Sequence, residues 1–129
     1  MADAGEPAGP GRVSARVLVA EDEALIALDL ERTLRSFGCE VLGPTASIAA
    51  TLELLGQERP DAVLLDVDLV DGLAVPVAET LAALQVPFAL VTGHHASPLD
   101  HSALYAVPRL EKPYAESELR RTLGQLIGR

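Results

Sequence analysis

The chain has 129 residues, of which 49% are hydrophobic and 3% aromatic, so it can form one ordinary domain whose interior consists mainly of Leu, Val, Ile and Ala. The formal net charge of −9 argues against nucleic-acid binding, which requires clustered Lys and Arg. No apolar run approaches the roughly 20 residues of a membrane span, and the N-terminus lacks the basic-then-apolar order of a signal peptide, so we expect a cytoplasmic protein.

The segment 1–13 is rich in Ala, Gly and Pro and has no apolar periodicity, so we expect a flexible leader followed by one domain over 14–129. That domain starts with an apolar run of strand length, and the run ends at Glu21, Asp22 and Glu23. A short apolar run followed by helical periodicity then recurs along the chain. We expect strands over 16–20, 39–42, 61–66, 87–91 and 107–110, and helices over 24–37, after Ser47, over 73–84, over 98–105 and along Leu119, Leu123 and Ile127.

Five strand–helix units in this order predict an α/β fold with a parallel sheet covered on both faces. The expected architecture is a flavodoxin-like doubly wound sheet with strand order 2-1-3-4-5 and five helices. In such a sheet, ligands bind beyond the carboxyl ends of the strands, where the first and third strands are neighbours. Glu21 and Asp22 follow the first expected strand and Asp66 ends the third, so these carboxylates should lie together.

Three carboxylates at one place repel each other unless a cation compensates them, and Mg²⁺ prefers oxygen ligands of this kind. Asp22 and Asp66 are the candidate ligands. The hydroxyl of Thr92 and the ammonium of Lys112 follow the fourth and fifth expected strands, so they should lie near these carboxylates. Hydrogen-bond donors and positive charge around a hard metal site are what phosphoryl transfer requires.

These residues, in this order and at these strand ends, resemble the motif of response-regulator receiver domains, and the resemblance extends from about residue 16 to the end of the chain. The segment 87–94 is partly similar to a receiver subfamily with a Phe-Ala-Thr-Gly-aromatic-Tyr signature, of which only Thr92-Gly93 is carried over. The resemblance implies a bacterial, stand-alone, phosphorylated signalling domain that is a monomer or weak dimer. It would be no enzyme beyond its own phosphorylation and dephosphorylation.

The resemblance also implies a role for each site residue. Asp66 would accept a phosphoryl group from the phosphohistidine of a histidine kinase or a histidine phosphotransfer protein, and the domain would then act on a downstream protein or as a phosphoryl shuttle or sink. The implied Mg²⁺ site consists of Asp22, Asp66 and the backbone carbonyl of Asp68, with Glu21 assisting through a metal-bound water. Thr92 and Lys112 would hold the phosphoryl oxygens, and Asp68 and His94 would modulate loss of the group.

One position departs from the family pattern. Receiver domains typically carry Tyr or Phe three residues before the lysine, as a rotating switch, and this chain has Arg109 there. The departure keeps open an alternative, in which the domain is a receiver-like binding module that works without phosphorylation. A less favoured alternative is a haloacid-dehalogenase-type phosphatase, because Asp66-Val67-Asp68 also resembles the nucleophile motif of that family.

Several of these residues also have ordinary structural interpretations. Asp22 and Glu23 could be carboxylates that favour the start of a helix, and Asp71-Gly72 is an ordinary turn signal. The histidines lack a metal-binding geometry, and Lys112-Pro113 could simply begin the last helix. Cys39, the single cysteine, cannot form an intramolecular disulfide and is expected to fill the core.

Overall fold

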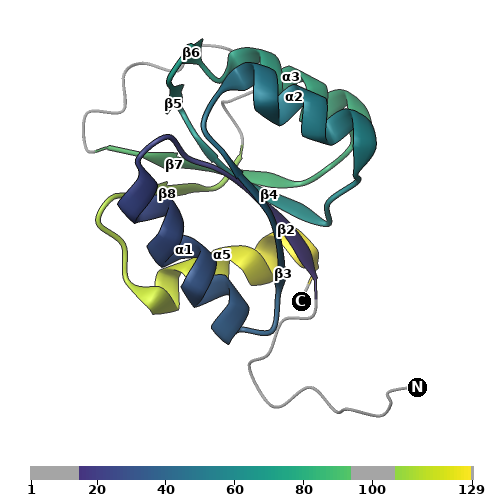
Figure 1. The fold of residues 1–129 in the computed structure, drawn as a ribbon. Helices are drawn as coiled ribbons and strands as arrows, with labels where there is room; N and C mark the ends of the chain where they lie inside the picture. Colours follow the sequence, from purple (N-terminus) through teal and green to yellow (C-terminus); the bar gives the residue numbers. More distant parts are fainter. Residues whose placement is uncertain (1–14, 94–106, 129) are drawn as a thin grey trace.

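A five-stranded parallel sheet forms the centre of the protein (Figure 1). The computed structural model describes residues 15–93 and 107–128. The strands lie in the order β3-β2-β4-β7-β8, which is the predicted order 2-1-3-4-5. Their bounds are β2 Arg16–Ala20, β3 Glu40–Thr45, β4 Ala62–Asp66, β7 Phe88–Thr92 and β8 Arg109–Glu111.

Helices cover both faces of the sheet, as the doubly wound fold requires (Figure 1). On one face lie α1 (Ala24–Ser36) and α5 (Glu116–Ile127), and on the other lie α2 (Ile48–Gln57) and α3 (Val75–Leu84). The helix expected over 98–105 and the leader expected over 1–13 lie outside the described residues. The prediction of a flavodoxin-like parallel sheet is therefore confirmed, with four helices in the described part of the chain.

Two apolar cores fill the space between the sheet and the helices. Alternate residues of each strand point to opposite faces, so Leu18 contributes to the core under α2 and α3 and Val19 to the core under α1 and α5. Leu, Val and Ala dominate both cores, as the composition predicts. Ile is missing from the fully buried set among the described residues, whereas both phenylalanines, Phe37 and Phe88, belong to it.

The helix starts and stops are mostly those that the sequence indicates. Ser47 caps α2, because its side chain accepts a hydrogen bond from the Ala50 amide at 3.0 Å. Gly38, with a positive φ of 96°, follows Phe37, the C-cap residue of α1. Lys112-Pro113 does not begin the last helix, since α5 starts only at Glu116.

A short antiparallel hairpin follows the third strand of the sheet and was not predicted. It consists of β5 (Asp68–Leu69) and β6 (Gly72–Leu73). The expectation that Leu73 belongs to a helix is wrong, because this residue lies in β6 with its surface 49% exposed, and α3 begins only at Val75. Strands of two residues are too short to produce a periodicity that the sequence could reveal.

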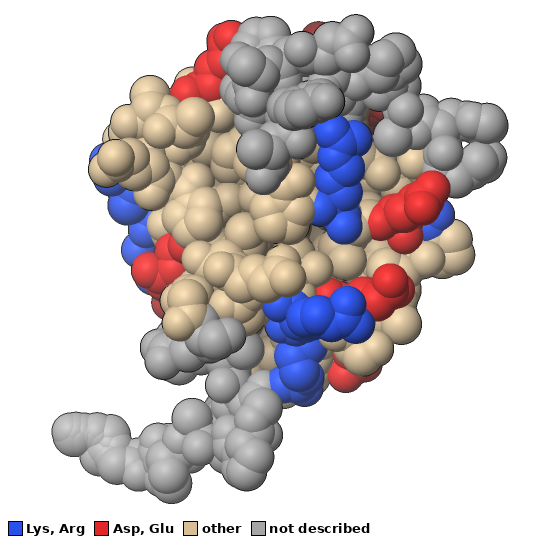
Figure 2. All heavy atoms as spheres, turned by 180° about the vertical axis from the view of Figure 1, so that it is seen from behind, with Lys and Arg blue, Asp and Glu red and all other residues tan. Residues whose placement is uncertain are grey.

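On the face turned away from the view of Figure 1, the basic side chains of the described residues do not form one continuous region. Figure 2 shows Lys and Arg there in separate groups, with acidic and uncharged side chains between them. This distribution agrees with the net charge of −9.

No helix among the described residues has both the length and the apolar character needed to cross a membrane.

Candidate functional site

The candidate site lies at the carboxyl end of the sheet, where four neighbouring strands end close together. Glu21 and Asp22 follow β2, and Asp66 is the last residue of β4, the strand beside it. Thr92 ends β7 on the other side of β4, and Lys112 follows β8, where its amide donates to the Thr92 carbonyl at 2.8 Å. The parallel register therefore brings together the five residues that the sequence singles out.

The ammonium of Lys112 lies between two carboxylates. Its Nζ is 3.1 Å from Asp66 Oδ2 and 3.0 Å from Glu21 Oε1, and Glu23 Oε1 lies farther away at 3.9 Å. Burial disfavours the charged ammonium, but Glu21 and Asp66 outweigh this effect, and the pKa of Lys112 lies above its usual value. Lys112 is therefore a fixed positive charge beside Asp66 at neutral pH.

Glu21 is almost completely buried, with 3% of its surface exposed. Burial raises the pKa of its carboxyl to about 7, and the neighbouring Asp66 carboxylate contributes in the same direction. Glu21 Oε2 accepts a hydrogen bond from the Glu23 amide at 3.0 Å. Glu21 Oε1 has no hydrogen-bond donor with suitable geometry among the described residues, although the charge of Lys112 is near.

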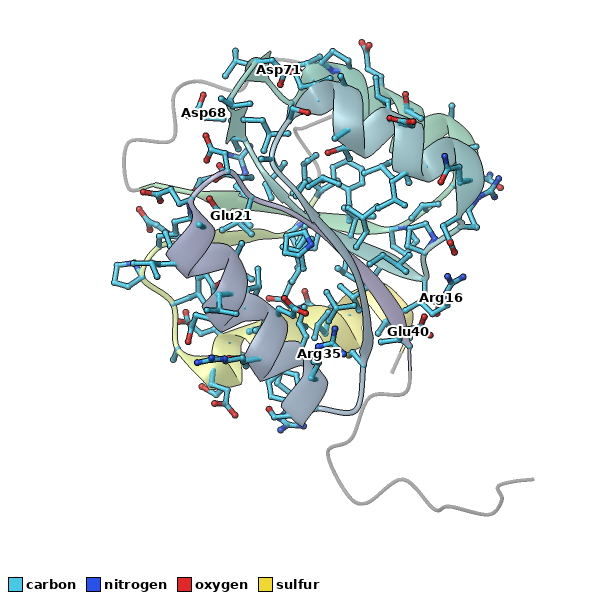
Figure 3. All side chains as sticks on the ribbon, in the orientation of Figure 1. Arg16, Glu21, Arg35, Glu40, Asp68 and Asp71 are labelled. Atoms are coloured by element: carbon cyan, nitrogen blue, oxygen red, sulfur yellow. The ribbon has the colours of Figure 1, made fainter. Side chains whose placement is uncertain are left out.

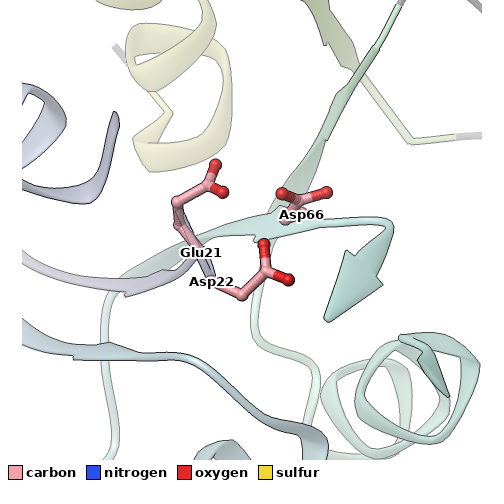
Figure 4. Close-up of side chains that lie close together, drawn as sticks. All are labelled: Glu21, Asp22 and Asp66. Carbon is pink, nitrogen blue, oxygen red and sulfur yellow. The ribbon is translucent and has the colours of Figure 1, made fainter. Parts of the chain in front are cut away.

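The carboxylates of Glu21, Asp22 and Asp66 face a common space (Figure 4). One oxygen from each lies within 4.8 Å of the others, a spacing that fits a shared cation. Asp66 is 7% exposed, whereas Asp22 is open to solvent and could complete a partly hydrated shell. These three carboxylates form a donor set that suits a hard divalent ion.

Asp68 lies at the edge of the same site. Its amide donates to Asp66 Oδ1 at 3.0 Å, and its side chain is exposed. Figure 3 shows Glu21, Asp68 and Asp71 at one end of the sheet and Arg16 and Glu40 at the opposite end. The expected contribution of the Asp68 backbone to the site is thus compatible with its position.

Of the remaining predicted residues, the structure describes Thr92 and Arg109 but not His94. Thr92 is buried, with 4% of its surface exposed, at the end of β7. Arg109 is exposed on β8, beside Leu90 of the neighbouring strand. His94 lies outside the described residues.

Two residues near the site were not predicted to belong to it. Glu23 was interpreted only as a helix-start carboxylate, yet its side chain is the third acid near Lys112. Tyr114 lines a pocket of about 540 Å³ between the start of α1 and the segment after Lys112. Its position directly after Lys112-Pro113 was the only signal that could have indicated this. Burial raises the pKa of Tyr114 to about 12, and Asp29 adds to the effect.

The fold and the acidic site are those of a receiver domain. The family model of the response regulator receiver domain matches residues 17–124, so the chain belongs to this family. The match favours the receiver interpretation over the haloacid-dehalogenase alternative.

Curated relatives of the chain are bacterial regulators. The transcriptional regulatory protein PdtaR of Mycobacterium tuberculosis is 34% identical over 110 residues, which are 83% of this chain and 54% of the relative. The phyllosphere-induced regulator PhyR of Methylorubrum extorquens is 25% identical over 118 residues, which are 89% of this chain and 44% of the relative. The chain therefore spans about half the length of these relatives.

Several solved structures superimpose closely on this chain. The receiver domain of Erythrobacter litoralis PhyR is 31% identical, with a TM-score of 0.78 and coverage of 89% of this chain and 91% of that one. SdrG of Sphingomonas melonis is 33% identical, with a TM-score of 0.78 and coverage of 88% and 97%. The receiver domain of the sensor histidine kinase PA1611 of Pseudomonas aeruginosa, 25% identical with a TM-score of 0.78 over 91% and 100%, holds a magnesium ion in its active-site cleft.

Proposed function

We propose that Asp66 accepts a phosphoryl group from the phosphohistidine of a histidine kinase or a histidine phosphotransfer protein, in a Mg²⁺-dependent reaction. The observation that carries this proposal is the pairing of Asp66 Oδ2 with Lys112 Nζ at 3.1 Å, beside the acidic cluster of Glu21, Asp22 and Asp66. Membership of the receiver family and the magnesium ion in the PA1611 domain support it.

In the proposed transfer, a carboxylate oxygen of Asp66 attacks the phosphorus of the phosphohistidine. The P–N bond breaks, its electron pair stays on the imidazole nitrogen, and an acyl phosphate forms on Asp66. Lys112 is charged and lies beside this carboxylate, so it can neutralise a phosphoryl oxygen, and the Thr92 hydroxyl can donate to another. When bound by Asp22, Asp66 and the Asp68 carbonyl, with Glu21 contacting a coordinated water, Mg²⁺ would supply positive charge to the remaining oxygens.

The phosphorylated domain would signal through protein contacts or serve as a phosphoryl shuttle or sink in a bacterial two-component pathway. Its proposed location is the cytoplasm, and it would catalyse only its own phosphorylation and dephosphorylation. Asp68, which is exposed beside Asp66, would modulate how fast water removes the group. Because the chain is negatively charged, its downstream partner would be a protein rather than a nucleic acid.

The test is the intact mass of the purified protein after incubation with acetyl phosphate and Mg²⁺. We expect the wild type to gain one phosphoryl group only when Mg²⁺ is present, and Asp66→Asn to gain none. Asp61→Asn is a matched control at the opposite end of the sheet, where Asn can still accept the hydrogen bond from the Arg16 amide. A gain that persists in Asp66→Asn would place the acceptor elsewhere and contradict the proposal.

The second candidate function is the receiver-like module that binds partners without phosphorylation. Arg109 favours it, because a long charged side chain is exposed on β8 where the family usually has an aromatic switch. A folded wild-type protein that gains no phosphoryl group under the same conditions would support this function over the first.

A further inference from the structure

The hairpin β5–β6 contacts the phosphoacceptor directly. Its first residue, Asp68, donates its amide hydrogen to Asp66 Oδ1 at 3.0 Å. The same residue supplies the backbone carbonyl of the proposed metal site. The position of this hairpin therefore determines how two polar groups of Asp68 lie relative to Asp66.

Apolar packing holds only some residues of the hairpin. Leu69 and Ala74 are 5% and 1% exposed, whereas Val70 and Leu73 are 70% and 49% exposed. Only two residue pairs, Asp68 with Leu73 and Leu69 with Gly72, join the strands. A ribbon this short is not stable by itself, so it requires contacts with the rest of the fold.

Those contacts come from the start of α2, and Asp71 at the hairpin turn makes two of them. Its Oδ1 accepts from the Ile48 amide at 2.6 Å and its Oδ2 accepts from the Ala49 amide at 3.2 Å. The Val70 amide donates to the Ala46 carbonyl at 3.1 Å. The hydrogen bond from Ile48, followed by that from Ala49, lowers the pKa of the Asp71 carboxyl, although this side chain is exposed.

Helix α2 does not depend on Asp71 alone for its cap. Ser47 already accepts the amide of Ala50, and Asp71 accepts the two preceding amides from a position 22 and 23 residues farther along the chain. Ser47 acts within the helix start, whereas Asp71 joins the helix start to the hairpin. Ser47 therefore caps the helix, whereas Asp71 also holds the hairpin against it.

We propose that Asp71 is a positioning residue, whose carboxylate tethers the β5–β6 hairpin to α2 and thereby sets Asp68 beside Asp66. The inference rests on the proposed function, because it assigns the tether a role in Mg²⁺ binding at that site. Side chains and backbone groups that orient metal ligands commonly affect metal affinity by an order of magnitude.

The experiment compares Asp71→Ala with Ser47→Ala in the full chain. Both variants remove an acceptor from the start of α2, but only Asp71→Ala also removes hydrogen bonds between α2 and the hairpin. Backbone amide shifts during a titration with MgCl₂ give the dissociation constant of Mg²⁺, and hydrogen exchange of the Asp68 amide reports the hairpin. In Asp71→Ala we expect the dissociation constant to increase about tenfold and the Asp68 amide to exchange faster.

In Ser47→Ala both quantities should stay near their wild-type values. Asp71→Asn keeps one oxygen that can accept from Ile48 or Ala49, so it should recover part of the Mg²⁺ affinity. Equal effects of Asp71→Ala and Ser47→Ala, in a wild type that binds Mg²⁺, would overturn the inference and leave the proposed function intact. Failure of the wild type to bind Mg²⁺ would overturn the proposed function and the metal role of Asp71 together, whereas Asp68 exchange would still show whether the tether exists.

Discussion

Lys112 is the only lysine of the chain, and its ammonium lies between the carboxylates of Glu21 and Asp66. A compact ammonium contacts both acids from one nitrogen, whereas the planar guanidinium of Arg would present different nitrogens to them in a fixed geometry. The site therefore uses the smaller of the two basic side chains, while the remaining basic residues of the chain are arginines.

We expect Lys112→Ala to slow phosphorylation of Asp66 by acetyl phosphate by about 100-fold, because a preorganised charge beside the transferring oxygens is lost. Lys112→Arg should restore only part of the rate. Arg121→Ala, which removes one positive charge from an exposed position on α5, is the control and should react like the wild type. The measurement is the phosphorylated fraction by intact mass against time, and a rate for Lys112→Ala close to that of the wild type would contradict this role.

The buried carboxyl of Glu21 should make the metal-free protein less stable as the pH rises. Its pKa lies at about 7 in the folded protein against a normal value of 4.5, so the folded state holds a proton that the unfolded state has already lost. Stability from this group is complete below pH 4.5 and decreases as the pH rises towards about 7. Urea unfolding across this range in EDTA should show a smaller decrease for Glu21→Gln than for the wild type.

The control for this pH dependence is Glu53→Gln, which changes an exposed carboxylate on α2. It should follow the wild type at every pH. If Glu21→Gln follows the wild type as well, burial of Glu21 does not favour its neutral form.

At the scale of the elements, the sequence predicts the sheet and most of the site because both depend on local patterns. An apolar run that ends in an acidic residue predicts a buried strand and also shows which side chain lies at its carboxyl end. The strand that ends at Asp66 is an example. Parallel pairing of neighbouring strands then brings the strand ends together without further information. For this reason Glu21, Asp22, Asp66, Thr92 and Lys112 could be assigned to one place before the structure was known.

The features that could not be predicted depend on contacts between distant residues. Asp71 was interpreted as a turn residue, and it does lie in a turn, but its bonds to Ile48 and Ala49 span 23 and 22 residues and leave no trace in local spacing. The raised pKa of Glu21 likewise results from burial and from Asp66, 45 positions away in the sequence, so it requires the folded structure. Leu73 was misplaced because its apolar character fits a helical periodicity although the residue lies in β6.

The start of α2 offers a prediction at the same scale. Ser47→Ala removes the acceptor of the Ala50 amide and should lower the free energy of unfolding by about 1 kcal/mol. Ser47→Asp can accept the same hydrogen bond and should retain most of that stability. Urea denaturation monitored by circular dichroism measures the difference, and a loss in Ser47→Asp as large as in Ser47→Ala would show that the hydroxyl has another role.

At the scale of the whole molecule, the strand that ends in the acidic site contributes side chains to both cores. Asp66 ends β4, whose Val63 and Leu65 pack under α2 and α3 while Leu64 packs under α1 and α5. An ion bound at the end of this strand would contact groups that are in place only when both cores are formed. Its binding free energy therefore adds to the stability of the entire domain rather than to one element.

Mg²⁺ should raise the melting temperature of the wild type. At a concentration ten times its dissociation constant, binding to the folded state alone contributes about 1.4 kcal/mol, which corresponds to an increase of about 5 °C for a domain of this size. Asp66→Asn removes one of the three clustered carboxylates and should show a clearly smaller increase, whereas Asp61→Asn at the opposite end of the sheet should respond like the wild type. Melting curves recorded with MgCl₂ and with NaCl at equal ionic strength separate binding from screening, because screening depends on ionic strength and is therefore similar in the two salts. An equal increase in Asp66→Asn would mean that the stabilising ion does not bind at the end of β4.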